Sequence, residues 1–157
     1  GDLVSAASTL PGAPHSGLEA GDALCQFHAD SAGLPGKYKA WLSDDTGSPS
    51  TRFTKSSKPW GRVDGVLVAG GWDDLTDGLI DARINVTETG AAIEPWPWIQ
   101  TGTTYTGAPA PANCAGWSSG LPDDRQQLGY PGYYDHRWTY AATNYCDGKA
   151  HLYCFQQ

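Results

Sequence analysis

Four cysteines, Cys25, Cys114, Cys146 and Cys154, constrain the fold of this chain more than any other feature. Their number is even and no two have the C-x-x-C spacing of a zinc site, which favours two disulfides over metal binding. We therefore expect a secreted or outer-surface domain in an oxidising compartment. Four cysteines allow three pairings. A bond between Cys146 and Cys154 is geometrically poor, because the segment between them has the pattern of an extended strand, in which residues this far apart are separated by roughly 26 Å.

Length and composition limit the class of protein. A chain of 157 residues fits one domain, and its 20 Gly and 11 Pro divide it into short segments joined by many turns. The net charge of −7 and the lack of a basic run exclude nucleic acid as an expected partner. No apolar stretch approaches the roughly 18 residues that span a bilayer. We expect a monomer with an extended lead-in over 1–17 and one domain over 18–157.

Apolar spacing predicts the order of the elements. A helix is expected from Leu18 to a C-terminal cap at Gly33. The remaining expectations are, in chain order, a strand over 37–45, a hairpin over 60–71 turning near Asp64 and Gly65, one helical turn over 72–80, a strand over 81–86, a polar loop reaching to about 132, and strands within 137–146 and 149–155.

Several of these segments together resemble one family. The segments are "ALCQFHADSAGLPGKYKAWLSDD", "WDDLTDGLI", "WIQTGT", "NCAGWSS", "QLG" and "HLYCFQQ". They are similar to the endostatin-like branch of the C-type lectin-like fold, which includes small surface lipoproteins of spirochaetes. The resemblance implies an α+β domain with a twisted antiparallel sheet, one or two helices and long loops. It also implies nested disulfides, Cys25 with Cys154 and Cys114 with Cys146, with the last strand beside the first and tied to the first helix.

Calcium is the one metal ion for which the sequence offers a candidate site. Sugar-binding members of the wider superfamily hold calcium through an E-P-N or Q-P-D tripeptide and a later W-N-D. The corresponding stretches here, "EPW" over 94–96 and "RWTY" over 137–140, lack the required amide and carboxylate. Asp73, Asp74 and Asp77 could supply oxygen ligands, although acidic residues at a helix N-terminus are the favoured interpretation. No other cofactor is expected.

Aromatic residues in Pro/Gly-rich loops are the better candidates for a binding site. Such loops carry variable binding chemistry on a rigid scaffold, and tyrosine offers a rigid apolar face with a hydroxyl group. Four tryptophans in the family-like segments, Trp41, Trp72, Trp98 and Trp117, are expected in the core instead. The candidate ligand-binding residues are Trp96, Tyr130, Tyr133, Tyr134, Asp135, Arg137 and Trp138.

These features favour a non-enzymatic module that binds an extracellular protein, such as a matrix or host factor. A lectin-like domain that binds a glycan, with or without calcium, is the alternative. A carboxylate-dependent hydrolase is less favoured. Asp123 with Asp124, or Glu94 with Asp135, would have to pair across a cleft, and the chain has no G-x-S-x-G, H-E-x-x-H or phosphate-binding loop.

Overall fold

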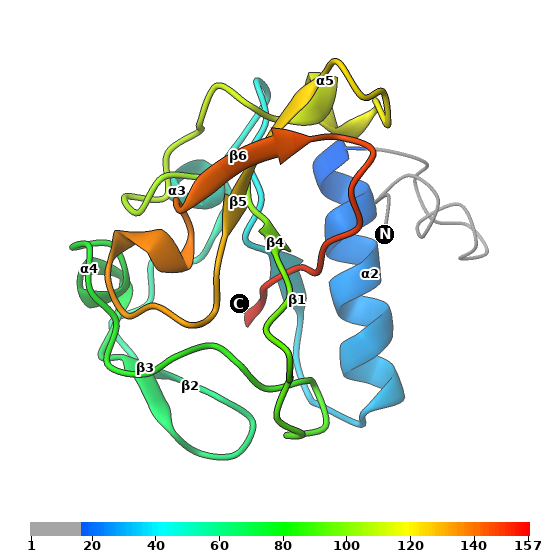
Figure 1. The fold of residues 1–157 in the computed structure, drawn as a ribbon. Coiled ribbons are helices and arrows are strands. Elements are labelled where there is room, and N and C mark those ends of the chain that lie inside the picture. The colour runs from blue at the N-terminus through cyan, green and yellow to red at the C-terminus, as the bar shows by residue number, and fades with distance from the viewer. Residues whose placement is uncertain (1–16) are drawn as a thin grey trace.

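Helix α2 (Gly17–Ser31) is the longest element of the computed structural model, which describes residues 17–157 (Figure 1). Its buried residues include Leu18, Cys25 and Ala29, whose spacing places them on one face of the helix. The predicted helix is thus confirmed, and it ends in a turn through Gly33. The predicted lead-in lies outside the described residues, apart from Gly17, which belongs to α2.

Within residues 17–157, seven short strands form three small antiparallel sheets, and long loops join them (Figure 1). The first sheet pairs β1 (Tyr38–Ala40) with β7 (Cys154–Gln156), the second pairs β2 (Trp60–Gly61) with β3 (Leu67–Ala69), and the third has the order β4 (Ile99–Gln100), β5 (Arg125–Gly129), β6 (Ala142–Tyr145). The α+β class is confirmed, and the first strand lies beside the last as expected. The expectation of one twisted sheet is wrong for residues 17–157.

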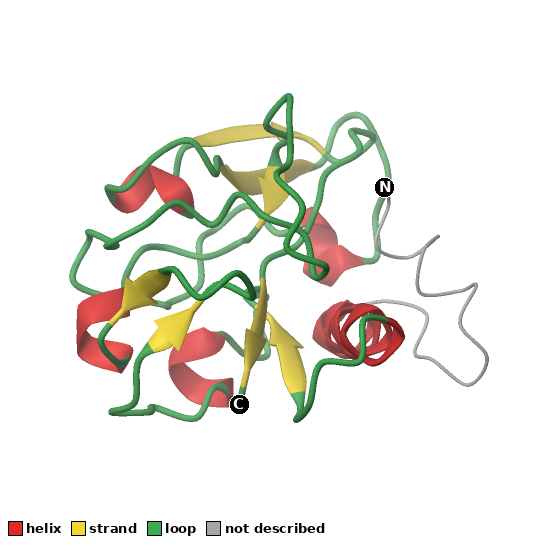
Figure 2. Cartoon of the chain, turned by 90° about the horizontal axis from the view of Figure 1, so that it is seen from below, coloured by secondary structure: helices red, strands yellow, loops and turns green. Residues whose placement is uncertain are grey.

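Short helices occupy some of the connections between the strands. They are α3 (Pro49–Arg52), α4 (Trp72–Leu75), α5 (Cys114–Trp117) and the 3₁₀-helix η1 (His136–Trp138). Helix α4 confirms the helical turn predicted within 72–80. In Figure 2, α2 is seen end-on beside the β1–β7 pair, with α3 and α4 on the other side of the strands.

The hairpin of β2 and β3 forms where the sequence predicted it. Its turn contains Gly65 at φ +87°, a left-handed conformation that favours glycine, and the Gly65 amide donates to the Arg62 carbonyl at 2.9 Å. Other strand predictions need correction. The strand expected over 37–45 is only three residues long, and 81–86 contains no strand, since Val86 makes an isolated bridge to Ala92. The strand expected over 149–155 begins only at Cys154.

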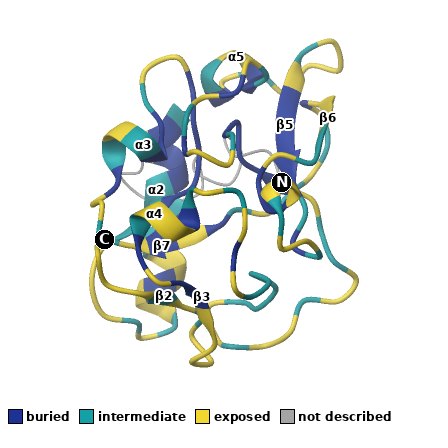
Figure 3. Ribbon diagram, turned by 90° about the vertical axis from the view of Figure 1, so that its left-hand side faces the viewer, coloured by how far each residue is buried: buried dark blue, intermediate teal, exposed yellow. Residues whose placement is uncertain are grey.

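Strand β5 overturns the prediction of a polar loop that extends to about residue 132. This strand is buried along most of its length despite two adjacent glutamines (Figure 3). The Gln126 side chain donates to the Tyr145 carbonyl at 2.6 Å, and the Gln127 side chain donates to the Ala142 carbonyl at 2.8 Å. Because both amides bond to the neighbouring strand, polar side chains are accommodated in the interior.

Trp41 lies at the centre of the main hydrophobic core and is fully buried. Its ring centroid lies 5.0 Å from that of Trp138 and 5.6 Å from those of Phe53 and Phe155. The Trp41 indole donates to the Thr139 hydroxyl at 2.7 Å, so the polar atom of this buried ring is paired. The core position predicted for Trp41 is therefore confirmed.

Two disulfides connect the elements around a second hydrophobic cluster. Cys25 bonds to Cys154 and Cys114 bonds to Cys146, with Cα atoms 5.4 and 5.8 Å apart. This nested pairing is the one that the family resemblance implied, and the outer bond joins α2 to β7. The cluster contains three of these cysteines together with Leu18, Ala40, Leu42 and Trp117. Over residues 17–157, no helix combines the length and the hydrophobicity needed to cross a membrane.

Candidate ligand-binding surface

Two loops at one end of the three-stranded sheet bring the predicted aromatic residues together. In the antiparallel register of β4 and β5, Ile99 lies opposite Gly129, which places Trp98 beside Tyr130. The ring centroids of Trp98 and Tyr130 are 5.1 Å apart, and those of Trp96 and Tyr130 are 6.0 Å apart. We call the five rings of Trp96, Trp98, Tyr130, Tyr133 and Tyr134 the aromatic surface.

The aromatic surface depends on a glycine between its tyrosines. A Cβ atom at Gly132 would lie only 2.4 Å from the ring of Trp96, so no larger residue fits without displacing that ring. The same Cβ would lie 3.0 Å from the Tyr130 ring, whose centroid is 5.8 Å from that of Tyr133. The Pro-Gly sequence that suggested a loop therefore also permits close packing of the rings.

Arg83 links the two loops, and the sequence analysis did not identify it. Its Nε donates to the Gly132 carbonyl at 2.9 Å. The central carbon of its guanidinium group lies 5.2 Å from the ring centroid of Trp96 and 4.6 Å from that of Tyr134, within the range of cation–π attraction. Arg83 thus fixes the loop backbone and supports two rings. The only sequence signal was an arginine in a segment that was expected to be a strand.

Asp135 and Arg137 form a bidentate ion pair beside Tyr133. The guanidinium donates to both Asp135 carboxylate oxygens, at 2.6 to 3.1 Å, and its central carbon lies 3.8 Å from the Tyr133 ring centroid. Hydrogen bonding from Arg137 lowers the pKa of Asp135 from 3.8 to about 2. Donating these hydrogen bonds to Asp135 in turn raises the pKa of Arg137. Both groups are therefore charged at neutral pH, and the pair adds polar atoms without net charge.

Exposure separates the rings that a ligand can reach from those that support them. Tyr134 is 45% exposed, Trp98 41% and Tyr133 36%, whereas Tyr130 and Trp96 are half-buried. The core position expected for Trp98 is therefore wrong. Trp117 is buried as expected, and Trp72 is only partly buried.

Trp138 does not belong to the exposed aromatic surface. It is fully buried, and its ring packs against Trp41 and Tyr153 with centroids 5.0 and 5.5 Å away. Around η1, Tyr133, Tyr134 and Arg137 are exposed, whereas Trp138 is buried. The six other candidate residues do lie together at the surface loops.

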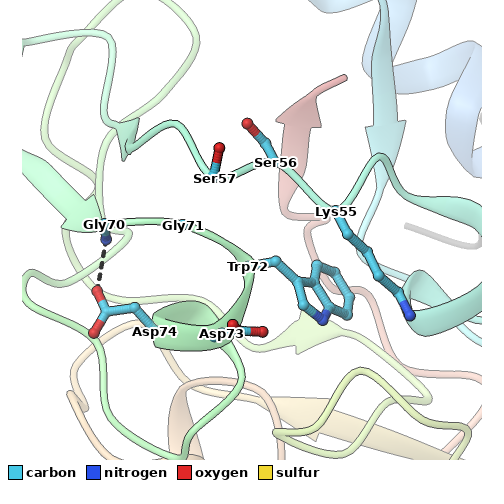
Figure 4. Close-up of a pocket in the computed structure, with 8 residues that line it drawn as sticks. All are labelled: Lys55, Ser56, Ser57, Gly70, Gly71, Trp72, Asp73 and Asp74. Carbon is cyan, nitrogen blue, oxygen red and sulfur yellow. Dashed lines mark hydrogen bonds between the residues drawn. The ribbon is translucent and has the colours of Figure 1, made fainter.

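The predicted calcium ligands do not form a metal site. Asp73 and Asp74 line a depression of about 360 Å³ beside Trp72, and their carboxylates point in different directions (Figure 4). Asp74 accepts from the Gly70 amide at 2.6 Å, and Asp77 accepts from the Leu79 amide at 2.9 Å. Within the described part of the chain, no group of three or more His, Cys, Asp or Glu side chains could hold a metal ion.

The aromatic surface combines apolar and hydrogen-bonding groups. Its exposed rings offer apolar faces, the tyrosine hydroxyls can donate and accept, and the Asp135–Arg137 pair offers directional hydrogen bonds. No protein-family model and no curated protein sequence matches this chain.

Proposed function

We propose that this chain is an extracellular or cell-surface module that binds a protein ligand through the aromatic surface and has no catalytic activity. The observation that carries the proposal is the gathering of three exposed rings, Trp98, Tyr133 and Tyr134, on two loops that Arg83 holds together. Rings of this kind supply most of the binding energy at many protein interfaces. Because their positions are already fixed, little conformational entropy is lost when a ligand binds.

The proposal includes a C-type lectin-like domain of the endostatin-like branch that acts as a monomer. The nested disulfides and the pairing of β1 with β7 support this assignment, since both are features that the resemblance implies. Two disulfides are also compatible with an oxidising extracellular compartment. An extracellular protein, such as a matrix or host factor, is then the expected partner.

A glycan is the second candidate ligand. Exposed Tyr133 and Tyr134 lie next to the Asp135–Arg137 pair, and ring faces beside polar groups suit the apolar and hydroxyl-bearing faces of a sugar. The geometry of Asp73, Asp74 and Asp77 gives no support to a calcium-dependent mode. Glycan binding through the aromatic surface would therefore be insensitive to chelators.

A binding screen distinguishes these ligand classes. The oxidised domain would be tested on an immobilised panel of extracellular matrix proteins, serum proteins and glycans, with calcium and with a chelator. Saturable binding to a protein, equal in both conditions, is the expected result. Binding to glycans alone would support the second candidate, and loss of binding with the chelator would contradict the assignment of the ligand to the aromatic surface. Lack of binding across the panel would refute the proposal for these ligand classes.

A further inference from the structure

The segment 77–83 borders the aromatic surface on the side of Tyr134. The Ile80 amide donates to the Tyr134 carbonyl at 2.8 Å. The residue before it, Leu79, forms an isolated bridge to Asp135. A ligand that lies on the aromatic surface can therefore also reach charged side chains of this segment.

Carboxylates outnumber arginines around the aromatic surface. The segments 77–83, 94–98 and 130–137 together contain four carboxylates, two arginines and no lysine. Asp77 and Asp81 are exposed, and neither belongs to an ion pair among residues 17–157. The two arginines, by contrast, lie against aromatic rings of the chain itself. The charge that a ligand meets here is therefore negative.

Trp98 is the one exposed ring of the aromatic surface that lies close to no cation within residues 17–157. Arg137 lies over Tyr133 at 3.8 Å and Arg83 over Tyr134 at 4.6 Å, measured from the guanidinium carbon to the ring centroid. The cation–π contacts of the described residues do not include Trp98, which is 41% exposed. Because indole attracts cations more strongly than the other aromatic rings do, a cation of the ligand can occupy this face.

We propose that the protein ligand presents a basic segment to the aromatic surface, with one arginine or lysine side chain on the ring of Trp98 and another paired with Asp77 and Asp81. This inference rests on the proposed function and names the chemistry of its ligand. The exposed indole face and the carboxylates both favour a positive partner. The net charge of −7 acts in the same direction, because it attracts basic proteins and repels acidic ones.

The first test uses two peptides that differ only in charge. The peptide Ac-Gly-Arg-Gly-Arg-Gly-Arg-Gly-NH2 carries guanidinium groups, and its citrulline counterpart replaces each of them with a neutral urea group of the same shape. Calorimetric titration of the oxidised protein at low salt should show that the arginine peptide binds at least about fivefold more tightly, and that added salt weakens it. Absence of saturable binding at about 1 mM peptide, or equal affinity for the two peptides, would overturn the proposal.

Substitutions locate the basic segment on the protein. Trp98→Leu removes the indole face but keeps an apolar side chain, and should weaken binding of the arginine peptide about threefold. Asp77→Asn/Asp81→Asn should weaken it by about threefold or more at low salt. The control Asp123→Asn/Asp124→Asn removes the same charge before the beginning of β5, whereas the aromatic surface follows the end of this strand, and should change the affinity by less than about twofold. Equal losses in the two asparagine pairs would reveal attraction by net charge alone and would refute the proposal.

The same variants separate this inference from the proposed function. The ligand found in the screen would be measured against each of them at low salt. If it requires Tyr133 and Tyr134 but binds normally to Trp98→Leu and to Asp77→Asn/Asp81→Asn, the basic segment is refuted and the aromatic surface remains the binding site. Normal binding of that ligand by Tyr133→Ala/Tyr134→Ala would instead refute the proposed function itself.

Discussion

The two disulfides are expected to stabilise the domain unequally. Cys25 and Cys154 are separated by 129 positions, whereas Cys114 and Cys146 are separated by 32. In the chain-entropy model, a bond that closes a longer loop removes more freedom from the unfolded chain. The two bonds then contribute about 5 and about 4 kcal/mol to the free energy of unfolding at 25 °C. Loss of the outer bond should therefore cost about 1 kcal/mol more.

The comparison requires variants in which only the bond changes. Cys25 and Cys114 are buried whereas Cys154 is exposed, so alanine substitutions would add unequal packing losses. Cys114→Ala/Cys146→Ala retains the outer bond, and Cys25→Ala/Cys154→Ala retains the inner one. Reducing each variant breaks its remaining bond and leaves the sulfur atoms in place. Urea unfolding before and after reduction, followed by circular dichroism, gives the two contributions. An inner bond that contributes as much as the outer one would refute the reasoning.

Two further predictions concern the loops of the aromatic surface. Gly132→Ala would place a Cβ atom 2.4 Å from the Trp96 ring and should lower the free energy of unfolding, measured by urea titration, by about 1–3 kcal/mol. The control Gly148→Ala has no neighbour closer than 3.6 Å to the added Cβ and should change that free energy by less than about 0.5 kcal/mol. Equal effects of the two substitutions would contradict the packing of Gly132 against Trp96. Because the pKa of Asp135 is lowered in the folded protein, the ionised carboxylate adds to the free energy of unfolding. This contribution is complete above about pH 4 and is lost as the pH falls through about 2. Carboxyl NMR should show that midpoint, with a return toward 3.8 in Arg137→Gln, and an unchanged midpoint would contradict the ion pair.

Local patterns in the sequence were sufficient to predict those elements whose structure depends on nearby residues. The helical spacing from Leu18 onward predicts α2, and the Asp64-Gly65 pair predicts the turn of the β2–β3 hairpin. Both signals act within a few residues, through one buried helix face or one left-handed backbone conformation. The disulfide pairing was different, because the residues alone disfavoured only the pairing that joins Cys146 to Cys154, and the family resemblance implied the nested one.

Strand β5 was missed because its stability comes from distant residues. Arg125–Gly129 reads as polar, and both glutamine amides donate to carbonyl groups of β6, which begins more than ten residues further along the chain. The role of Arg83 was missed for the same reason, because its partners Trp96 and Gly132 lie outside its own segment of the sequence.

Burial within a segment was also difficult to predict. Trp98 was expected inside and Trp138 at the surface, and the structure reverses both positions. The register of β4 on β5 places Trp98 against Tyr130 at the edge of the sheet, whereas η1 directs Trp138 toward Trp41. A large apolar ring suits either environment, so the type of residue alone could not decide.

The most direct test of the central claim compares tyrosines in similar settings on two parts of the surface. Tyr133 lies under Arg137, with the guanidinium carbon 3.8 Å from the ring centroid, and Tyr145 lies under Arg125 at 3.9 Å. Tyr145 pairs with Arg125 at the beginning of β5, while the aromatic surface lies at its end. The affinity of the ligand found in the screen would be measured for Tyr133→Ala/Tyr134→Ala and for Tyr145→Ala by surface plasmon resonance. We expect the double variant, still folded, to lose at least tenfold in affinity and Tyr145→Ala to bind normally. Normal binding by the double variant would contradict the claim that the aromatic surface recognises the ligand.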